Sequence, residues 1–209
     1  MSAYDAIISG LKSNLEYLFA CGIREIPVLH SAGRKAEILS PCEGCALKGE
    51  AVEPLPRVGA ERPDVVFVLG CRVDESGGPF DGEEGALLEK IITDGMKYKK
   101  DEVAVCYAMR CASGEDEKTS AQAASSCAGL LMEDLRRLRP KAVIAMGPVA
   151  ALSLAGSSDV ESLRARLIEK HGLKLIVTYG PDVLVKNPLL KKDAWKDIKL
   201  VLNLLNRPK

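Results

Sequence analysis

The sequence predicts a three-layer α/β fold, in which helices cover both faces of a central four-stranded parallel sheet. Four short apolar runs recur along the chain, and three of them are almost continuously apolar, as strands buried on both faces should be. Stretches with helical periodicity separate these runs, and strand alternating with helix is typical of a doubly wound sheet. The chain has 209 residues, of which 47% are hydrophobic, enough for one sizeable core.

The expected elements follow one another along the chain. The apolar runs predict strands at 65–69, 103–107, 142–146 and 173–179. The periodic stretches predict helices near 83–98, 120–138, 148–169 with a break at Gly156, and 190–205. A further amphipathic helix is expected over 3–20, followed by a proline-rich arm. We therefore divide the chain into an N-terminal helical extension and arm, residues 1–38, and an α/β domain, residues 39–209.

The net charge of the chain indicates which partners it can attract electrostatically. Lys plus Arg and Asp plus Glu both number 29, so no global attraction to nucleic acid or to an anionic membrane is expected. No apolar run approaches the length of a membrane span, and the first residues lack the pattern of a secretory signal. The expected location is the cytoplasm, without membrane contact.

Cysteine is the first residue type that points to chemistry. The chain has seven cysteines, and in a reducing compartment they are poor candidates for disulfides. Cys42 and Cys45 form a CxxC pair in the proline-rich segment, and Cys111 and Cys127 could complete a four-thiolate site. Such a site suits zinc or an iron–sulfur cluster, and spacing does not choose between them. The cysteines could also be small buried hydrophobes, as we expect for Cys106.

Several motifs together resemble a known family. After the CxxC pair come a strand-end glycine, Gly70, and the run Gly-x-Pro-Phe-x-Gly-x-x-Gly at 77–85, and then the two later cysteines. Residues 139–151 and 181–188 continue the match. This pattern is similar to the iron–sulfur uracil-DNA glycosylases of families 4 and 5. The resemblance implies that family's α/β/α sandwich, and a [4Fe-4S] cluster held by Cys42, Cys45, Cys111 and Cys127.

The active-site positions that the resemblance implies are largely changed. Of the family's first motif only Gly70 survives. Tyr107 stands where family 4 carries an asparagine that reads the uracil edge, and Gly180 stands where a histidine hydrogen-bonds the uracil carbonyl. Phe80 matches the phenylalanine on which the base stacks. Losing one preorganised donor costs about 2.7 to 4 kcal/mol of barrier, so ordinary uracil excision should be silenced.

Two acids follow Gly70 in the sequence, and the local charge is negative. Asp74 and Glu75 stand near the place where a water must be activated, so they are either a reassigned general base or solvated loop acids. Acidic residues outnumber basic ones in 71–90, namely Asp74, Glu75, Asp81, Glu83, Glu84 and Glu89 against Arg72 and Lys90. Phosphates would be repelled there, which disfavours DNA as a partner.

Basic residues gather elsewhere in the chain. One group is Arg136, Arg137, Arg139 and Lys141; the other is Lys186, Lys191, Lys192 and Lys196. The first group precedes a strand and reads as a solvated helix end. The second lies in the segment that wedges into DNA in the family, where Leu184 is either a wedge or a packing residue.

Two functional hypotheses result. The first is a [4Fe-4S] protein on the uracil-DNA glycosylase scaffold that is not an efficient uracil glycosylase, with a cluster that is structural or serves electron transfer or sensing with a protein partner. The alternative is a divergent DNA glycosylase that excises uracil or another damaged base in base-excision repair. In that alternative Phe80 stacks on the base, Tyr107 shapes the pocket, and Asp74 or Glu75 handles water. A structural zinc domain comes third.

Overall fold

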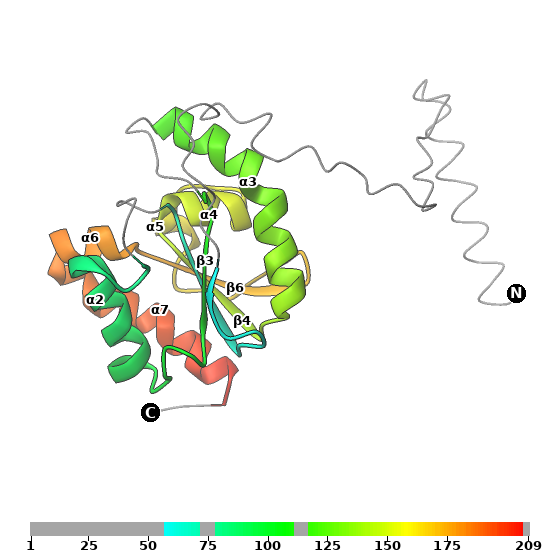
Figure 1. Ribbon diagram of the computed structural model, residues 1–209. Coiled ribbons are helices and arrows are strands. Elements are labelled where there is room, and N and C mark those ends of the chain that lie inside the picture. Colours follow the sequence, from blue (N-terminus) through cyan, green and yellow to red (C-terminus); the bar gives the residue numbers. More distant parts are fainter. Residues whose placement is uncertain (1–56, 72–77, 111–116, 207–209) are drawn as a thin grey trace, which may run out of the picture. The chain divides into compact units, whose positions relative to one another are not determined.

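The computed structural model describes residues 57–71, 78–110 and 117–206, with side chains from residue 123 onward in the last range (Figure 1). The helix expected over 3–20 and the division at residue 38 lie outside the described residues. No helix in the described ranges is long and apolar enough to cross a membrane.

The α/β fold is confirmed, but the sheet has six strands rather than four. Its order is β1-β3-β2-β4-β6-β5. The four inner strands are parallel and match the four apolar runs: β2 Val65–Leu69, β3 Ala104–Tyr107, β4 Ala142–Met146 and β6 Leu173–Thr178. Two short antiparallel strands form the edges, β1 Val58–Gly59 and β5 Ile168–Lys170.

The edge strands have little sequence signal because they are short and partly exposed. Val58 and Gly59 are both exposed, and their pairing depends on β3. At Gly59 an added Cβ would lie 2.1 Å from the carbonyl oxygen of Val103, so only glycine permits this close approach. The helix predicted over 148–169 is wrong at its C-terminal end, where the structure has strand β5. The helical part consists of two helices, α4 Pro148–Ala155 and α5 Val160–Leu163.

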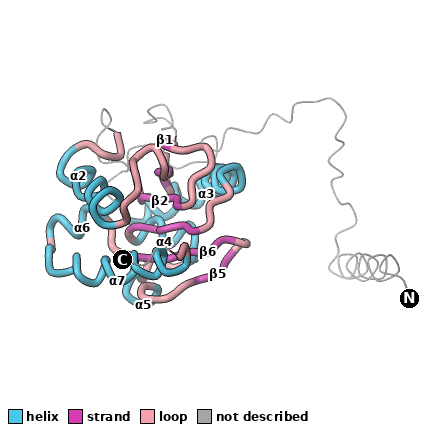
Figure 2. Tube along the Cα trace, turned by 90° about the horizontal axis from the view of Figure 1, so that it is seen from below, coloured by secondary structure: helices cyan, strands magenta, loops and turns pink. Residues whose placement is uncertain are grey.

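The remaining helices complete two outer layers. They are α2 Gly82–Lys90, the π-helix η2 Ile91–Gly95, α3 Glu117–Leu138, α6 Pro181–Lys186, the 3-10 helix η3 Pro188–Leu190 and α7 Lys191–Leu204. Figure 1 shows α2 and α7 on one side of the sheet and α3 on the other, and Figure 2 gives the view from below.

Alternate residues of each inner strand enter different cores. In β2, Val66 and Val68 pack with residues of α3 and α4, whereas Val65 and Phe67 pack with residues of α2 and α7. Because both faces are buried, the strands read as continuous apolar runs. This packing fixes the four parallel strands with their carboxyl ends at one edge, where ligands bind in such folds.

Candidate functional site

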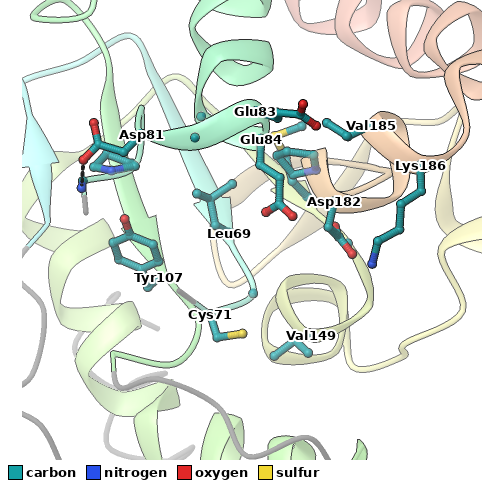
Figure 3. Close-up of a pocket in the computed structure, with 18 of the residues that line it drawn as sticks. Leu69, Cys71, Asp81, Glu83, Glu84, Tyr107, Val149, Asp182, Val185 and Lys186 are labelled. Atoms are coloured by element: carbon teal, nitrogen blue, oxygen red, sulfur yellow. Dashed lines mark hydrogen bonds between the residues drawn. The ribbon is translucent and has the colours of Figure 1, made fainter. Parts of the chain in front are cut away.

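A cleft of about 660 Å³ opens at the carboxyl ends of the parallel strands (Figure 3). We call it the carboxyl-end cleft. Strand ends and the first turns of three helices line it. Its described lining is Leu69, Gly70, Cys71, Gly78, Pro79, Asp81, Gly82, Glu83, Glu84, Gly85, Tyr107, Met146, Gly147, Pro148, Val149, Pro181, Asp182, Val185 and Lys186. This is the position where ligands bind in doubly wound α/β folds.

Two glycines at the ends of β4 and β6 let the backbone pass closely at the cleft. Gly147 has φ 88° and ψ 174°, a conformation that is essentially restricted to glycine. Its N–H donates to the Thr178 carbonyl oxygen at 2.9 Å, and a Cβ on it would lie 3.5 Å from the Gly180 Cα. The backbones after β4 and β6 therefore approach each other closely, because neither Gly147 nor Gly180 has a side chain.

The carboxylate of Asp182 occupies the place that a side chain at position 180 would need. A Cβ added at Gly180 would lie 2.3 Å from Asp182 Oδ1, far inside van der Waals contact. Asp182 is in the first turn of α6, where the helix dipole favours a negative charge. A side chain at 180 would require Asp182 to change its rotamer. The position where the family's histidine is expected thus holds a carboxylate that reaches back from two residues later.

Carboxylates dominate the charge of the cleft. Asp81, Glu83 and Glu84 come from the start of α2 and Asp182 from α6, against one cation in the described lining, Lys186. Figure 3 shows Glu84 and Asp182 extending toward the same region of the cleft, with Lys186 close by. Anionic groups should therefore enter this cleft less favourably than neutral or cationic ones.

The predicted pocket residues are only partly brought together. Gly70 and Tyr107 line the cleft, and Tyr107 is buried, with 5% of its surface exposed. Gly180 is buried behind the lining formed by Pro181 and Asp182. Phe80 is not among the described lining residues, because its ring packs against the α2–α7 core.

Some predictions stay untested. Lys100 Nζ lies 5.3 Å from the centroid of the Phe80 ring, and the stacking role of Phe80 stays a prediction. Asp74 and Glu75 lie outside the described residues.

Of the four predicted cluster ligands, Cys127 is described. It lies on α3 with 6% of its surface exposed, whereas Cys42, Cys45 and Cys111 lie outside the described residues. Within the described ranges, no three His, Cys, Asp or Glu side chains gather in a metal-binding arrangement. The donor chemistry fits a soft metal centre, because four thiolates are the ligands of both zinc and iron–sulfur sites.

Two other cysteines differ in their surroundings. Cys106 is buried in β3, and this burial raises the pKa of its thiol to about 12, so it is an unreactive packing residue, as its place in a strand predicts. Cys71 lines the carboxyl-end cleft and packs against the buried cluster of Met109, Ala123 and Ala124.

Residues 181–188 decide between the two alternatives for Leu184. Leu184 is 1% exposed and packs with Tyr179 and Ala194, so it is a core residue and does not project as a wedge. Lys186 is exposed at the cleft. The cations of residues 136–141 lie at the opposite end of the sheet, next to the amino end of β4.

Comparisons with known proteins agree with this geometry. The sequence model of the uracil DNA glycosylase superfamily matches residues 56–199. The chain belongs to this superfamily. It is 25% identical to the Type-4 uracil-DNA glycosylase of Archaeoglobus fulgidus over 183 residues, 82% of this chain and 91% of that protein. It is 23% identical to the enzyme of the same name from Pyrobaculum aerophilum, over 78% of this chain and 89% of that protein.

The superfamily scaffold is therefore confirmed, and the carboxyl-end cleft of this chain holds Asp182 beside Gly180. Sequence reasoning placed the carboxylates of α2 near the pocket but missed Asp182 as a cleft residue. A sequence signal for it exists, since Pro181 and Asp182 form the start of a helix that two residues separate from the end of β6. That its oxygen fills the space beside Gly180 depends on rotamer and backbone approach, which no sequence pattern states.

Proposed function

We propose that this protein is an iron–sulfur member of the superfamily that keeps a base-sized cleft but does not excise uracil efficiently. The observation that carries this proposal is the Asp182 carboxylate beside Gly180. Uracil leaves its sugar as an anion, and catalysis needs a hydrogen-bond donor where that charge grows. Here a carboxylate oxygen lies 2.3 Å from the place of a residue-180 Cβ, and it repels the same charge.

The charge of the cleft supports the proposal independently. Asp81, Glu83 and Glu84 add three carboxylates to the rim, and Lys186 is the cation opposite them in the described lining. DNA approaches a protein through phosphates, and its affinity comes largely from clustered Lys and Arg. An acidic rim weakens binding of a duplex at this cleft.

The cluster part of the proposal depends on four thiolates. Cys42, Cys45, Cys111 and Cys127 would hold a [4Fe-4S] cluster, which would join the segment before β1 to the segment between β3 and α3. We propose a structural role for it, or electron transfer or sensing with a protein partner. Thiolates of this kind persist in a reducing compartment, which supports a cytoplasmic location.

Anaerobic purification tests the cluster. We expect a brown protein with about four irons per chain, and a large loss of iron in Cys127→Ser. Cys106→Ser, at a buried cysteine outside the proposed ligand set, is the matched control and should keep its iron. A colourless protein that holds one zinc would contradict the cluster.

The uracil prediction is tested on single-stranded and duplex oligonucleotides that carry one uracil. We expect no abasic product under conditions in which the Archaeoglobus fulgidus Type-4 enzyme converts the substrate completely. The double variant Gly180→His/Asp182→Ala restores a donor and removes the competing carboxylate, so it should gain activity. Robust uracil excision by the unaltered protein would overturn the proposal.

A second candidate function is excision of a cationic, N-alkylated base, and the open acidic cleft favours it. A purine alkylated at N3 or N7 carries a positive charge, which carboxylates stabilise. Hydrolysis breaks its N-glycosidic bond, and the base leaves as a neutral molecule with the bonding electrons. The water oxygen bonds to the sugar carbon, and a carboxylate takes the water proton. No oxyanion develops, so the reaction does not need a donor at position 180.

The alkylated-base candidate is tested with duplexes that contain N7-methylguanine, with uracil and hypoxanthine duplexes alongside. We expect excision of the alkylated base alone, reduced in Asp182→Asn and unchanged in Asp193→Asn, which alters an exposed carboxylate outside the cleft. Absence of any excision would reject this candidate and leave the first proposal standing.

A further inference from the structure

A second cleft, of about 580 Å³, lies at the opposite end of the sheet from the carboxyl-end cleft. We call it the basic cleft. Three segments line it: the residues just before β2, the last turn of α3, and the residues just before β4. The lining consists of Arg62, Pro63, Asp64, Arg136, Arg137, Leu138, Arg139 and Lys141.

The backbone holds these segments in a defined arrangement. Strands β2 and β4 are neighbours, and Val65 pairs with Ala142. The N–H groups of Lys141 and Ala142 both donate to the Asp64 carbonyl oxygen, at 3.0 and 3.1 Å. The cleft is therefore built on the amino ends of β2 and β4, although Arg62 is distant in the sequence from the other four cations.

Five cations and one carboxylate line the basic cleft. Among the described residues that line the basic cleft, Lys141 Nζ forms an ion pair with Asp64 Oδ1 at 2.8 Å. For the four arginines, the structure records no carboxylate partner among the described residues. A concave surface with this excess of guanidinium groups attracts phosphate, which arginine binds with two parallel hydrogen bonds.

Helix capping does not account for the whole cluster. Arg136 and Arg137 complement the negative end of α3, as cations do at many helix ends. Arg62 and Lys141, however, lie outside any helix. Arg139 has φ 49°, a left-handed conformation in which glycine is the preferred residue after a helix. An arginine at this position adds a cation to the cleft, although its backbone is in a conformation that non-glycine residues disfavour.

We propose that the basic cleft binds adjacent phosphate groups of a polyanion. Two sources carry this chemistry, a free polyphosphate chain and the backbone of a nucleic acid. The site is distinct from the carboxyl-end cleft, and the proposal holds whether or not the protein excises a base.

The test uses the full chain and two probes, inorganic triphosphate followed by calorimetry and labelled single-stranded and duplex oligonucleotides followed by fluorescence anisotropy at several salt concentrations. In Arg136→Gln/Arg137→Gln we expect affinity to fall at least about fivefold and the log–log salt slope to fall by about 1.5. The matched control is Lys90→Gln/Lys199→Gln, which removes the same charge from the exposed surfaces of α2 and α7, outside both clefts, and should leave both values unchanged.

Two further variants separate binding from folding. Asp64→Asn removes the cleft's carboxylate and should tighten binding, a gain that damage to the fold would not produce. Arg139→Gly relieves the left-handed backbone, so the melting temperature should be unchanged or higher while affinity falls.

The outcomes decide both the site and the source. Cleft-dependent binding of triphosphate alone assigns a small polyphosphate, and cleft-dependent binding of oligonucleotides assigns a nucleic-acid backbone. Equal losses in the cleft variant and the Lys90/Lys199 control would overturn the proposal, because binding would then follow net charge. Absence of binding to both probes would overturn it as well.

Discussion

At the scale of single residues, Asp197 shows how one buried carboxylate joins three parts of the fold. It has no exposed surface, and it accepts hydrogen bonds from Thr178 Oγ1 at 2.9 Å, Arg164 Nε at 3.2 Å and the Ala165 N–H at 3.0 Å. Burial raises the pKa of this carboxyl, and the three donors oppose part of that rise. The network ties α7 to β6 and to the turn after α5.

Asp197→Ala should lower the free energy of unfolding by about 3 kcal/mol or more, because it leaves a buried guanidinium without its counter-charge. The Arg164 side chain is 15% exposed, so water replaces the lost carboxylate poorly. Denaturant unfolding measures the change. The control is Asp193→Ala, which breaks an exposed pair with Lys196 and should barely alter unfolding. Equal effects of the two variants would contradict a buried network.

Tyr179 provides a residue-scale prediction about pH. Its hydroxyl donates to Glu161 Oε1 at 2.6 Å, and burial together with this bond raises its pKa to about 12 from an ordinary value of 10.0. Between these values the unfolded chain loses the proton while the folded chain keeps it. Stability from this group is therefore fully present below pH 10 and is lost as the pH rises toward 12.

Tyr179→Phe keeps the ring beneath Arg164, whose Cζ lies 5.1 Å from the ring centroid, and removes the titrating hydroxyl. We expect the melting temperature of this variant to fall less steeply than that of the unaltered protein between pH 10 and 12. Parallel curves for the two proteins would show that Tyr179 titrates normally.

At the scale of elements, the loop before α2 meets its own helix so closely that one glycine is required. A Cβ on Gly85 would lie 2.2 Å from the Phe80 carbonyl carbon. The Gly78 N–H and the Asp81 side chain close the same turn by a hydrogen bond. This turn places Asp81, Glu83 and Glu84 at the carboxyl-end cleft, so Gly85 determines the shape of this part of the site.

Gly85→Ala should cost about 2 to 3 kcal/mol of stability and displace the start of α2, because backbone cannot yield as a side chain does. Gly82→Ala is the matched control. Gly82 has φ 70° but no neighbouring atom within 4 Å, so it should cost only about 1 kcal/mol of backbone strain. Thermal unfolding ranks the two variants, and a larger loss in Gly82→Ala would reverse the argument.

The elements differ in how far the sequence predicts them. The four inner strands are buried on both faces, so β2 and β4 have the predicted bounds. For Ile168–Lys170 the sequence predicts the end of a helix, because this segment has no strand pattern of its own, whereas the structure has strand β5 there. It becomes a strand by pairing with β6 through a turn in which His171 and Gly172 have positive φ.

At the scale of the whole molecule, zero net charge conceals two clefts of opposite sign at the two ends of the sheet. Sequence reasoning identified the acidic segment near the strand ends, since its residues are contiguous. From the sequence, the cations of 136–141 are predicted to form a solvated helix end. Arg62 belongs to the same cleft because β2 and β4 are neighbours, and sheet order is not visible in local sequence.

The sequence by itself determined the α/β class, the four parallel strands and the superfamily, because apolar periodicity and motif glycines act locally along the chain. It also predicted that Gly180 lacks the donor that uracil excision needs. Only the tertiary structure decided that Asp182 fills the space beside Gly180, that Phe80 packs against the α2–α7 core, and that five cations share a basic cleft. The first depends on the rotamer of Asp182 and on the backbone turn at the start of α6, and the other two depend on segments far apart in the sequence that the fold brings together. Side-chain type alone specifies neither.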